Sequence, residues 1–484
     1  MTTTRLLIDG VECESASQTS VEVINPSNGR CVSSIPAGCD DDVERAVAAA
    51  RRAFNDGRWG DEPPSVRKKA LHRLADLVEA EGAQFDAMDA EEMGKPVKEV
   101  AFNATAAASF VRFYAEAVDK LTGDVYTSDK ASLVLQRWVA RGVVAGIVPW
   151  NFPTFVAAMK LGPALAAGNT VILKPSELSP GSAVRLGQLA LRAGIPPGVL
   201  NVVPGLGETA GKALALHSDV DMIAFTGSTE VGKLLLQYAG QSNLKSVMAE
   251  CGGKSPQVVF GDGVDLDAAA TAIAGFLLTN QGQICSVGSR LLVQQAVEDD
   301  LLERIMSHFR KIVIGDARDP RTTFGPLASA KQCDRVMRYI ESASTDRAEL
   351  VAGGKRTLQA SGGYFVEPTI FRKVTPTARI AQEEIFGPVL SVMSFEDEAE
   401  AIRIANSTTY GLGAYVWTSN LSTGMRMAKG IRSSVAINSV APTGEGAGYA
   451  ASWEPCGQSG IGAEGGLAGM QSYLRRQLME FYHA

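Results

Sequence analysis

Several features that assign a protein to a class are missing from this 484-residue sequence. Positive charge is not in excess, because 46 Lys and Arg stand against 53 Asp and Glu, for a net charge of −7. A chain with this balance has no basic surface for nucleic acid or for an anionic membrane, so neither is an expected partner. With 45% hydrophobic and 20% charged residues, it has the composition of a globular protein.

The cysteines indicate neither a zinc site nor a disulfide framework, because the seven of them include no C-x-x-C pair and are odd in number. No metal is predicted, and a reducing cytoplasm suits these thiols. Residues 1–10 contain no apolar run of secretory length, so export is not expected. The uncharged window 142–159 has two prolines and Asn151 near its middle, which a strand, a turn and a helix start explain better than a membrane span.

Short apolar runs alternate with helical patterns between residues 143 and 250, and this alternation predicts an α/β fold with a doubly wound parallel sheet. The expected strands are 143–148, 170–173, 199–203, 222–225 and 246–249, and the expected helices between them are 155–167, 182–193, 210–217 and 231–238. Strands 6–9 and 21–24 and helices that begin near Asp40 and Pro63 precede them. Such a sheet binds its ligand at the carboxyl ends of its strands, so residues 1–120 and 141–252 are the predicted dinucleotide-binding domain.

A second alternating series predicts an α/β catalytic domain at residues 253–452. Its expected strands are 257–260, 291–294, 389–395 and 412–417, and its expected helices are 265–279, 297–312, 331–344, 398–406 and 423–431. The segments 121–140 and 467–484 lie outside both series. For them an edge strand and a subunit contact both stay open.

Cys285 is the candidate nucleophile, because it lies among small and flexible residues where a predicted helix gives way to a glycine-containing turn. A free thiol titrates near pH 8.5, so the site must lower that pKa or supply a base. A lone cysteine is more often a small hydrophobic residue, and only the neighbouring motifs favour chemistry here.

Asn151 and Glu250 follow predicted strands, at the edge of the sheet where a ligand is expected. Two prolines fix the backbone around Asn151, whose amide is either an oxyanion donor or an ordinary turn former. None of the four histidines lies in these strand-end stretches, so a thiol enzyme built here needs Glu250 as its base. The alternative is a solvated loop glutamate.

Two glycine-rich stretches resemble phosphate loops. Gly227 to Lys233 matches G-x-x-x-x-G-K, but Leu234 stands where a hydroxyl would hold magnesium, so an ATPase is not expected. The stretch from Gly205 to Gly211 misses the usual dinucleotide spacing by one residue. Each could be a plain turn, but together they indicate a dinucleotide bound in an unusual way.

These stretches together resemble the aldehyde dehydrogenase superfamily, of the NAD(P)-dependent, hydrolytic type. The matching stretches span essentially the whole chain and are Pro149-Trp-Asn-Phe-Pro153, Lys174-Pro-Ser-Glu177, Phe225-Thr-Gly-Ser-Thr-Glu-Val-Gly232, Glu250-Cys-Gly-Gly-Lys-Ser-Pro256, Gly282-Gln-Ile-Cys285 and Glu383-Glu-Ile-Phe-Gly-Pro-Val389. The resemblance implies a Rossmann-like dinucleotide-binding domain, a catalytic domain and a small β oligomerisation flap at 121–140 and 467–484. It also implies a homodimer or homotetramer.

The resemblance implies that Cys285 attacks an aldehyde and gives a thiohemiacetal, whose oxyanion meets the Asn151 amide and the Cys285 backbone N–H. Hydride then passes to the nicotinamide. Water activated by Glu250 hydrolyses the thioester that remains, and the product is a carboxylic acid.

By the same resemblance, Lys174 and Glu177 contact the adenosine ribose, and Glu384 and Phe386 hold the nicotinamide ribose. The full set of cofactor residues is Ile147, Val148, Pro149, Trp150, Lys174, Glu177, Gly207, Gly211, Phe225, Thr226, Gly227, Ser228, Val231, Glu384 and Phe386. Glu177 would repel a 2′-phosphate, so the expected cofactor is NAD, with NADP possible.

The expected substrate pocket comprises Phe152, Val156, Met159, Ile284, Ser286 and Trp453. Met159 stands where semialdehyde enzymes of this family often carry Arg and betaine-aldehyde enzymes carry Trp. We therefore expect an uncharged aromatic or medium-chain aliphatic aldehyde. The alternatives are a semialdehyde or aminoaldehyde dehydrogenase, a coenzyme-A-acylating enzyme and, in another class, a non-catalytic binding or structural relative.

Overall fold

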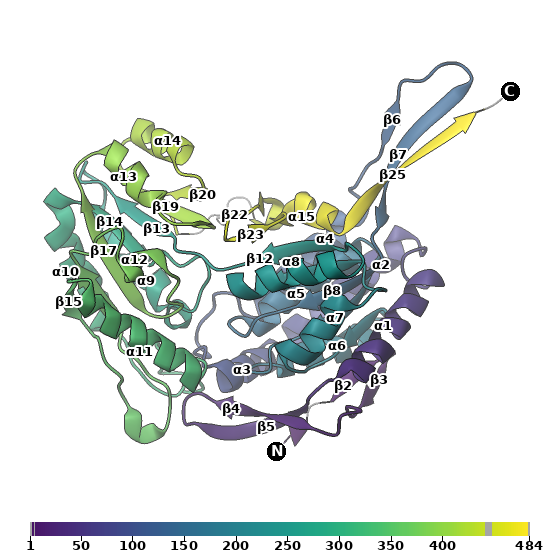
Figure 1. Cartoon of the computed structure of the whole chain (residues 1–484), viewed down its shortest axis with the longest axis horizontal. Coiled ribbons are helices and arrows are strands. Elements are labelled where there is room, and N and C mark those ends of the chain that lie inside the picture. The colour runs from purple at the N-terminus through teal and green to yellow at the C-terminus, as the bar shows by residue number, and fades with distance from the viewer. Residues whose placement is uncertain (1, 4, 441–447, 483–484) are drawn as a thin grey trace.

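The computed structural model describes residues 2–3, 5–440 and 448–482 (Figure 1). Its first sheet contains the five predicted strands as β8 (Val143–Ile147), β9 (Thr170–Lys174), β10 (Leu200–Val202), β11 (Met222–Thr226) and β12 (Ser246–Glu250). The order across the sheet is β23-β12-β11-β8-β9-β10-β2-β3, where β2 is Leu6–Ile8, β3 is Val11–Cys13 and β23 is Gly460–Ile461. The five central strands run parallel, and antiparallel strands close both edges. The predicted doubly wound sheet is confirmed.

The connections between these strands place the helices on the sheet. The helices are α5 (Pro153–Ala166), α6 (Gly181–Arg192), α7 (Lys212–Leu216) and α8 (Thr229–Gln241), and each begins within a few residues of its predicted start. A single turn of π-helix at Gly207–Gly211 precedes α7, where the sequence indicated ordinary helix from residue 210. The chain continues from β8 to β9 on one side of β8, whereas β11 lies on the other side. The strand order therefore reverses between β8 and β11, although these two strands run parallel. This reversal is where open α/β sheets bind ligands.

The second sheet has the order β15-β16-β17-β14-β13-β19-β20. Its predicted strands are β13 (Pro256–Val259), β14 (Arg290–Gln294), β17 (Val389–Phe395) and β19 (Gly413–Trp417), and β15 (Glu349–Ala352), β16 (Thr369–Arg372) and β20 (Ser434–Ile437) were not predicted. The predicted helices are α9 (Leu266–Leu278), α10 (Glu298–Phe309), α11 (Ala330–Thr345), α13 (Glu398–Ala405) and α14 (Leu421–Gly430). Figure 1 shows the two sheets in two bodies that lie side by side. The chain leaves the first sheet after β12 and enters the second at β13, and the domain boundary near residue 252 stays a prediction.

The N-terminal part adds β1 (Thr2–Thr3), β4 (Ser20–Asn25) and β5 (Arg30–Pro36) in a separate small sheet, and the helices α1 (Asp40–Asn55), α2 (Pro64–Ala80), α3 (Gly82–Met93) and α4 (Ala104–Ala117). The sequence predicted α1 and α2 but not α3 or α4. The apolar residues of α4 are mostly alanines, which give no clear one-sided pattern, and its start is fixed by the Asn103 side chain, which accepts from the Ala106 N–H.

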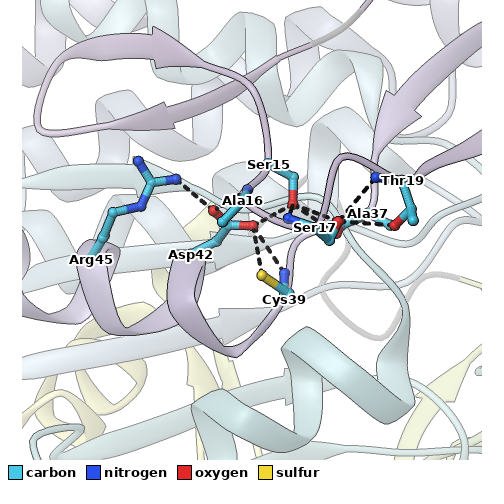
Figure 2. Close-up of polar contacts among 8 residues, drawn as sticks. All are labelled: Ser15, Ala16, Ser17, Thr19, Ala37, Cys39, Asp42 and Arg45. Atoms are coloured by element: carbon cyan, nitrogen blue, oxygen red, sulfur yellow. Dashed lines mark hydrogen bonds and ion pairs between the residues drawn. The ribbon is translucent and has the colours of Figure 1, made fainter.

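Asp42, in the first turn of α1, is a buried anchor rather than a solvated acid. Its carboxylate accepts hydrogen bonds from Ser15 Oγ at 2.5 Å and from the Cys39 N–H at 3.0 Å, and it forms an ion pair with Arg45 (Figure 2). Burial alone would raise the pKa of Asp42, but these hydrogen bonds outweigh it and lower the pKa to about 2. The anchor joins α1 to the loop that contains Ser15.

Strands from the segments outside both series form an arm that projects from the body (Figure 1). The predicted β flap is wrong for the start of 467–484, because this part lies in the helix α15 (Gly466–Ser472). In it β7 (Ser132–Ala140) pairs antiparallel with β6 (Asp124–Tyr126) and along its full length with β25 (Leu474–Tyr482). The expected β structure is thus present in 121–140, whereas the subunit contact stays a prediction; residues 483 and 484 lie outside the described part. Exposed apolar side chains on the arm are Val125, Tyr126, Leu133, Leu478 and Phe481.

The largest apolar cluster extends from the first sheet into the second body and includes Phe152, Val156, Met159 and Ile284. Four of the residues predicted for the substrate pocket therefore belong to this cluster. In the ranges that the structure describes, no helix is both long enough and apolar enough to cross a membrane.

Candidate active site

Two of the predicted catalytic residues lie at the carboxyl ends of β8 and β12, at the edge of the sheet near the point where the strand order reverses. Asn151 lies in the turn between β8 and α5, and Glu250 is the last residue of β12. Cys285 follows α9 and a 3₁₀ turn at Thr279–Gly282. Asn280 and Gln281 in that turn have φ values of 46° and 56°, so the chain turns sharply just before Cys285.

Two reciprocal hydrogen bonds tie the Asn151 turn to the Cys285 turn. The Asn151 side-chain amide donates to the Gln283 carbonyl at 2.9 Å, and the Asn280 amide donates to the Asn151 carbonyl at 2.8 Å. All three side chains are buried. Asn151, the predicted amide donor, is therefore bonded to the residue that stands two positions before the predicted nucleophile, Cys285. Asn280 and Gln283 were not singled out in the sequence, where their only signal was an amide-rich turn.

Gly252 and Gly253 allow the segment after Glu250 to approach other backbone closely. A Cβ on Gly253 would lie 2.4 Å from the Cys285 carbonyl oxygen, and one on Gly252 would lie 2.4 Å from a Glu384 carboxylate oxygen. The Gly253 N–H donates to Glu384 at 3.0 Å. Gly253 therefore tolerates no side chain, because the atom in the way is backbone, whereas a side chain at Gly252 would displace the Glu384 carboxylate. The segment thus touches both Glu384, a predicted cofactor residue, and the backbone of Cys285.

Three acidic groups influence one another at this point. Burial raises the pKa of the half-buried Cys285 thiol to about 12, and the charges of Glu250 and Glu384 add to the shift. Burial also raises the pKa of Glu384 to about 7, although the Gly253 N–H opposes the shift. The pKa of Glu250 is raised well above 4.5 by burial and by Glu464. The resting cysteine is therefore a thiol, and Glu250, which is 5% exposed, is not a solvated loop residue.

A buried ion pair lies beside Glu250. Lys160 Nζ is 2.6 Å from Glu464 Oε1, and the two side chains are 0% and 2% exposed. The charge of Lys160 and a hydrogen bond from the Trp453 side chain both lower the pKa of Glu250 and so oppose its rise. Trp453 pairs with Glu464 across the short strands β21 (Ser452–Trp453) and β24 (Glu464–Gly465). No sequence pattern singled out Lys160 or Glu464, which are 304 residues apart.

The predicted cofactor residues follow β8, β9, β10 and β11 along the same edge. Lys174 is buried, donates to the Pro175 carbonyl at 2.9 Å and lies 3.9 Å from the Glu177 carboxylate, and burial lowers its pKa. The Trp150 ring meets the Phe386 ring edge-on at 5.3 Å. The first contact joins the two residues expected at the adenosine ribose, and the second joins Trp150 to a residue expected at the nicotinamide ribose. Of the other predicted members, Ile147, Val148, Pro149, Gly207, Gly211, Phe225, Thr226, Gly227 and Ser228 lie at the strand ends or in the turns after them. Val231 lies in the first turn of α8, and Glu384 follows α12 (Arg379–Gln382) in the second body, as Phe386 does.

Several features of this edge fit a bound dinucleotide. A Cβ built on Gly207 meets nothing within 4 Å, so the space beside that turn is open. Among the described residues, the buried Thr226 hydroxyl has no hydrogen-bond partner. Ser228 caps α8 by accepting from the Val231 N–H, and the start of this 13-residue helix faces the same edge with its positive dipole end. By contrast, Lys233 donates to the Gln458 side chain at 3.1 Å rather than closing a phosphate loop.

Four of the predicted pocket residues, Phe152, Val156, Met159 and Ile284, are buried in one apolar cluster, and Ser286 and Trp453 are half-buried. None of the six is charged. Sequence inspection missed Phe102, whose ring centroid lies 4.7 Å from that of Phe152. Phe102 comes from a loop before α4, about 50 residues away along the chain, so no local pattern indicated the contact.

Comparison with known proteins gives one consistent result. The sequence model described as "Aldehyde dehydrogenase family" matches residues 13–479. The chain is 44% identical to the NADP/NAD-dependent aldehyde dehydrogenase PuuC of Escherichia coli (strain K12), over 90% of this chain and 87% of that protein. It is 42% identical to an aminoacetaldehyde dehydrogenase of Pseudomonas aeruginosa, over 89% of this chain and 86% of that protein.

Solved structures agree. The aldehyde dehydrogenase KauB from Pseudomonas aeruginosa superimposes with a TM-score of 0.96 and 45% identity, over 99% of this chain and 97% of that one. An indole-3-acetaldehyde dehydrogenase in complex with NAD+ gives a TM-score of 0.96 and 44% identity with the same coverage.

Proposed function

Because the chain belongs to the aldehyde dehydrogenase family, we propose that it oxidises an aldehyde to the carboxylic acid with reduction of NAD, and that Cys285, Asn151 and Glu250 do the chemistry. One observation carries these roles. The Asn151 amide is bonded to the Gln283 carbonyl, two residues before Cys285, while the charge of Glu250 is close enough to raise the pKa of the Cys285 thiol. Nucleophile, amide donor and base therefore share one site.

In the first step the sulfur of Cys285 bonds to the aldehyde carbon and the thiol proton leaves. Glu250 is the carboxylate that receives the proton, because it acts most strongly on the thiol among the neighbouring charges. The carbonyl oxygen becomes an oxyanion. The Asn151 amide has two N–H groups, and one of them already donates to Gln283, so the other remains for this oxygen.

The backbone also stabilises the sulfur as it loses its proton. The N–H groups of Ser286 and Cys285 hydrogen-bond to the Cys285 sulfur and lower the pKa of the thiol, so both favour the thiolate that bonds to the aldehyde carbon. The second Asn151 N–H is the donor for the oxyanion, and one such donor is typically worth about a hundredfold to a thousandfold in rate.

NAD, when bound, supplies the hydride acceptor that turns the thiohemiacetal into a thioester. Lys174 and Glu177 would hold its adenosine ribose, Trp150 and Ser228 would lie along the pyrophosphate, and Glu384 and Phe386 would hold the nicotinamide ribose. The exposed Glu177 carboxylate would repel a 2′-phosphate, which favours NAD over NADP.

Glu250 acts again when water hydrolyses the thioester, after the proton taken from the thiol has passed to solvent. It removes a proton from the water, whose oxygen bonds to the thioester carbon as the bond from that carbon to the Cys285 sulfur breaks. A carboxylate with a raised pKa is a stronger base, and burial beside Glu464 raises the pKa of Glu250. The charge of Lys160 opposes that rise and so favours the ionised carboxylate that acts as the base. A base in this position favours hydrolysis over transfer of the acyl group to coenzyme A.

The substrate is an uncharged aromatic or medium-chain aliphatic aldehyde. Support comes from the six pocket residues, which carry no charge, and from the buried Met159, which offers a carboxylated aldehyde no cation. The main competitor is an aminoaldehyde, because an aminoacetaldehyde dehydrogenase is among the relatives. A substrate ammonium would need a carboxylate, and Glu250 and Glu464 are both buried.

The arm would join copies of this chain into a homodimer or homotetramer. Its exposed apolar side chains, among them Phe481 and Val125, lie on a sheet that projects from the body and would be covered by another copy. The cytoplasm is the proposed compartment, because all seven cysteines are unpaired.

The test is NADH formation by purified protein with aromatic, aliphatic, amino and carboxylated aldehydes, and with NADP and coenzyme A in parallel assays. Cys285→Ala should abolish turnover, and Cys31→Ala on β5 is the matched control that should not change it. A higher kcat/KM for an amino or carboxylated aldehyde would refute the substrate assignment. No turnover of any aldehyde by protein that binds NAD would favour a non-catalytic relative, and an acyl-coenzyme A product would refute hydrolysis.

A further inference from the structure

Phe102 is held in an unusual backbone conformation. Its φ is 53°, in the left-handed region that bulky residues rarely adopt. It stands immediately before Asn103, which caps α4, so its position is fixed by the start of that helix. A glycine would adopt this conformation with less strain. Phe102 therefore occupies a position where the backbone conformation favours glycine. Residues in such unfavourable backbone conformations are often found at ligand sites.

The ring of Phe102 extends the predicted substrate pocket outward. Its centroid lies 4.7 Å from that of Phe152 and 5.0 Å from that of Phe155. Phe152 directly follows Asn151 and belongs to the same apolar cluster as Ile284, the residue before Cys285. Phe152 and Phe155 are buried, whereas Phe102 is half-buried. Phe102 is therefore the solvent-facing end of an aromatic row that leads toward the nucleophile.

The row continues around the first turns of α4. The Phe155 ring lies 5.8 Å from Phe110, and Phe110 meets the half-buried Tyr449 edge-on at 5.2 Å. The Tyr449 hydroxyl donates to the Ala106 carbonyl at 3.3 Å, so its polar atom already has a partner within the protein. Phe102 and Tyr449 thus present two half-buried rings at the outer edge of one uncharged cluster.

We propose that Phe102 is a specificity-determining residue whose ring, continued by Phe152, stacks against the planar side chain of an aryl or arylalkyl aldehyde. The inference rests on the proposed function, since it assumes that aldehydes reach Cys285 past Phe152. Aromatic rings attract one another beyond simple area burial in offset or edge-on arrangements, whereas a short aliphatic aldehyde makes no such contact. Phe102 therefore favours aromatic over small aliphatic substrates without touching the reacting atoms.

The experiment compares kcat/KM for phenylacetaldehyde and for propanal in the wild type and in Phe102→Ala, Phe102→Leu and Phe102→Tyr. For Phe102→Ala we expect a loss of roughly 3- to 10-fold with phenylacetaldehyde, in the range of one aromatic pair, and less than about 2-fold with propanal. The loss should appear mainly in KM, because the contact is made equally in the ground state and the transition state. Phe102→Tyr should restore most of the preference, and Phe102→Leu should not.

Phe113→Ala is the matched control, because Phe113 is a half-buried ring on α4 whose ring contact is with Tyr114. It should leave the ratio of the two kcat/KM values unchanged. An equal loss with both aldehydes in Phe102→Ala and Phe102→Leu would show that Phe102 only supports the fold of the pocket and would overturn the inference. Failure of the wild type to oxidise either aldehyde would instead refute the proposed function, so the two failures are distinguishable.

Discussion

Replacing either member of the buried Lys160–Glu464 pair should shift the pH dependence of hydrolysis in opposite directions. Glu250 works as a base only when it is deprotonated, so activity is lost as the pH falls below its pKa. Glu464 raises the pKa of Glu250 and Lys160 lowers it. Lys160→Met should therefore move the acidic limb of the kcat profile to higher pH, and Glu464→Gln should move it to lower pH.

The size of the shift follows from the burial of the pair. A charge that acts on a carboxyl group in buried surroundings typically changes its pKa by about 1–3 units, so each single variant should move the limb by about one unit or more. Each single variant also leaves one buried charge without its partner at 2.6 Å. That loss costs about 3–5 kcal/mol of unfolding free energy. The double variant Lys160→Met/Glu464→Leu should recover most of the stability and bring the limb back toward the wild type.

The assays are kcat against pH with a saturating aldehyde and thermal unfolding of the same proteins. Lys68→Met removes the lysine of an exposed pair with Glu116 and should change neither the limb nor the stability measurably. Shifts of the same sign in Lys160→Met and Glu464→Gln would refute the electrostatic reasoning. So would an unchanged limb in both variants, because the pair would then act on stability alone.

Further predictions concern Gly253 in the segment after β12, the Asp42 anchor of α1 and the proposed base Glu250. Gly253→Ala should abolish turnover, because its Cβ would lie 2.4 Å from the Cys285 carbonyl; Gly240→Ala, with nothing within 4 Å, is the control for activity assays. Asp42→Asn should lower the free energy of unfolding by about 1–3 kcal/mol, the usual cost of disrupting a buried hydrogen-bonded group. Because the folded pKa of Asp42 is lowered to about 2, its stabilisation is present above pH 4 and lost between pH 4 and 2, and acid unfolding should lose that component in the variant. Glu250→Gln should stop hydrolysis and lower the pKa of Cys285, seen as iodoacetamide alkylation that begins at lower pH; an unchanged alkylation profile would contradict the coupling.

The strands of both sheets could be predicted from the sequence because a buried parallel strand is a short apolar run between turns. The same rule explains the failures. Residues 104–117 are rich in alanine, and 369–372 and 434–437 are four-residue strands with few apolar neighbours in sequence, so none of the three produced a clear pattern.

The site divides along similar lines. Asn151 and Glu250 could be selected because each follows a strand, and strand ends meet at one edge of the sheet. Lys160 sits in an apolar helix, Glu464 lies 304 residues further along, and Phe102 comes from an irregular loop. No local rule connects these three to the site, because tertiary packing alone brings them there.

A thiol with a pKa near 12 is compatible with a nucleophile in this site because of how the charges are coupled. Part of that pKa is the repulsion between the thiolate and an ionised Glu250. If the thiol proton passes to Glu250, that repulsion disappears in the same step, since the carboxyl becomes neutral as the sulfur becomes charged. The net charge of the buried site does not change, so no further charge has to be buried. Loss of the proton to solvent would instead leave two anions side by side. The raised pKa of the thiol therefore favours proton transfer within the site over ionisation in the resting enzyme.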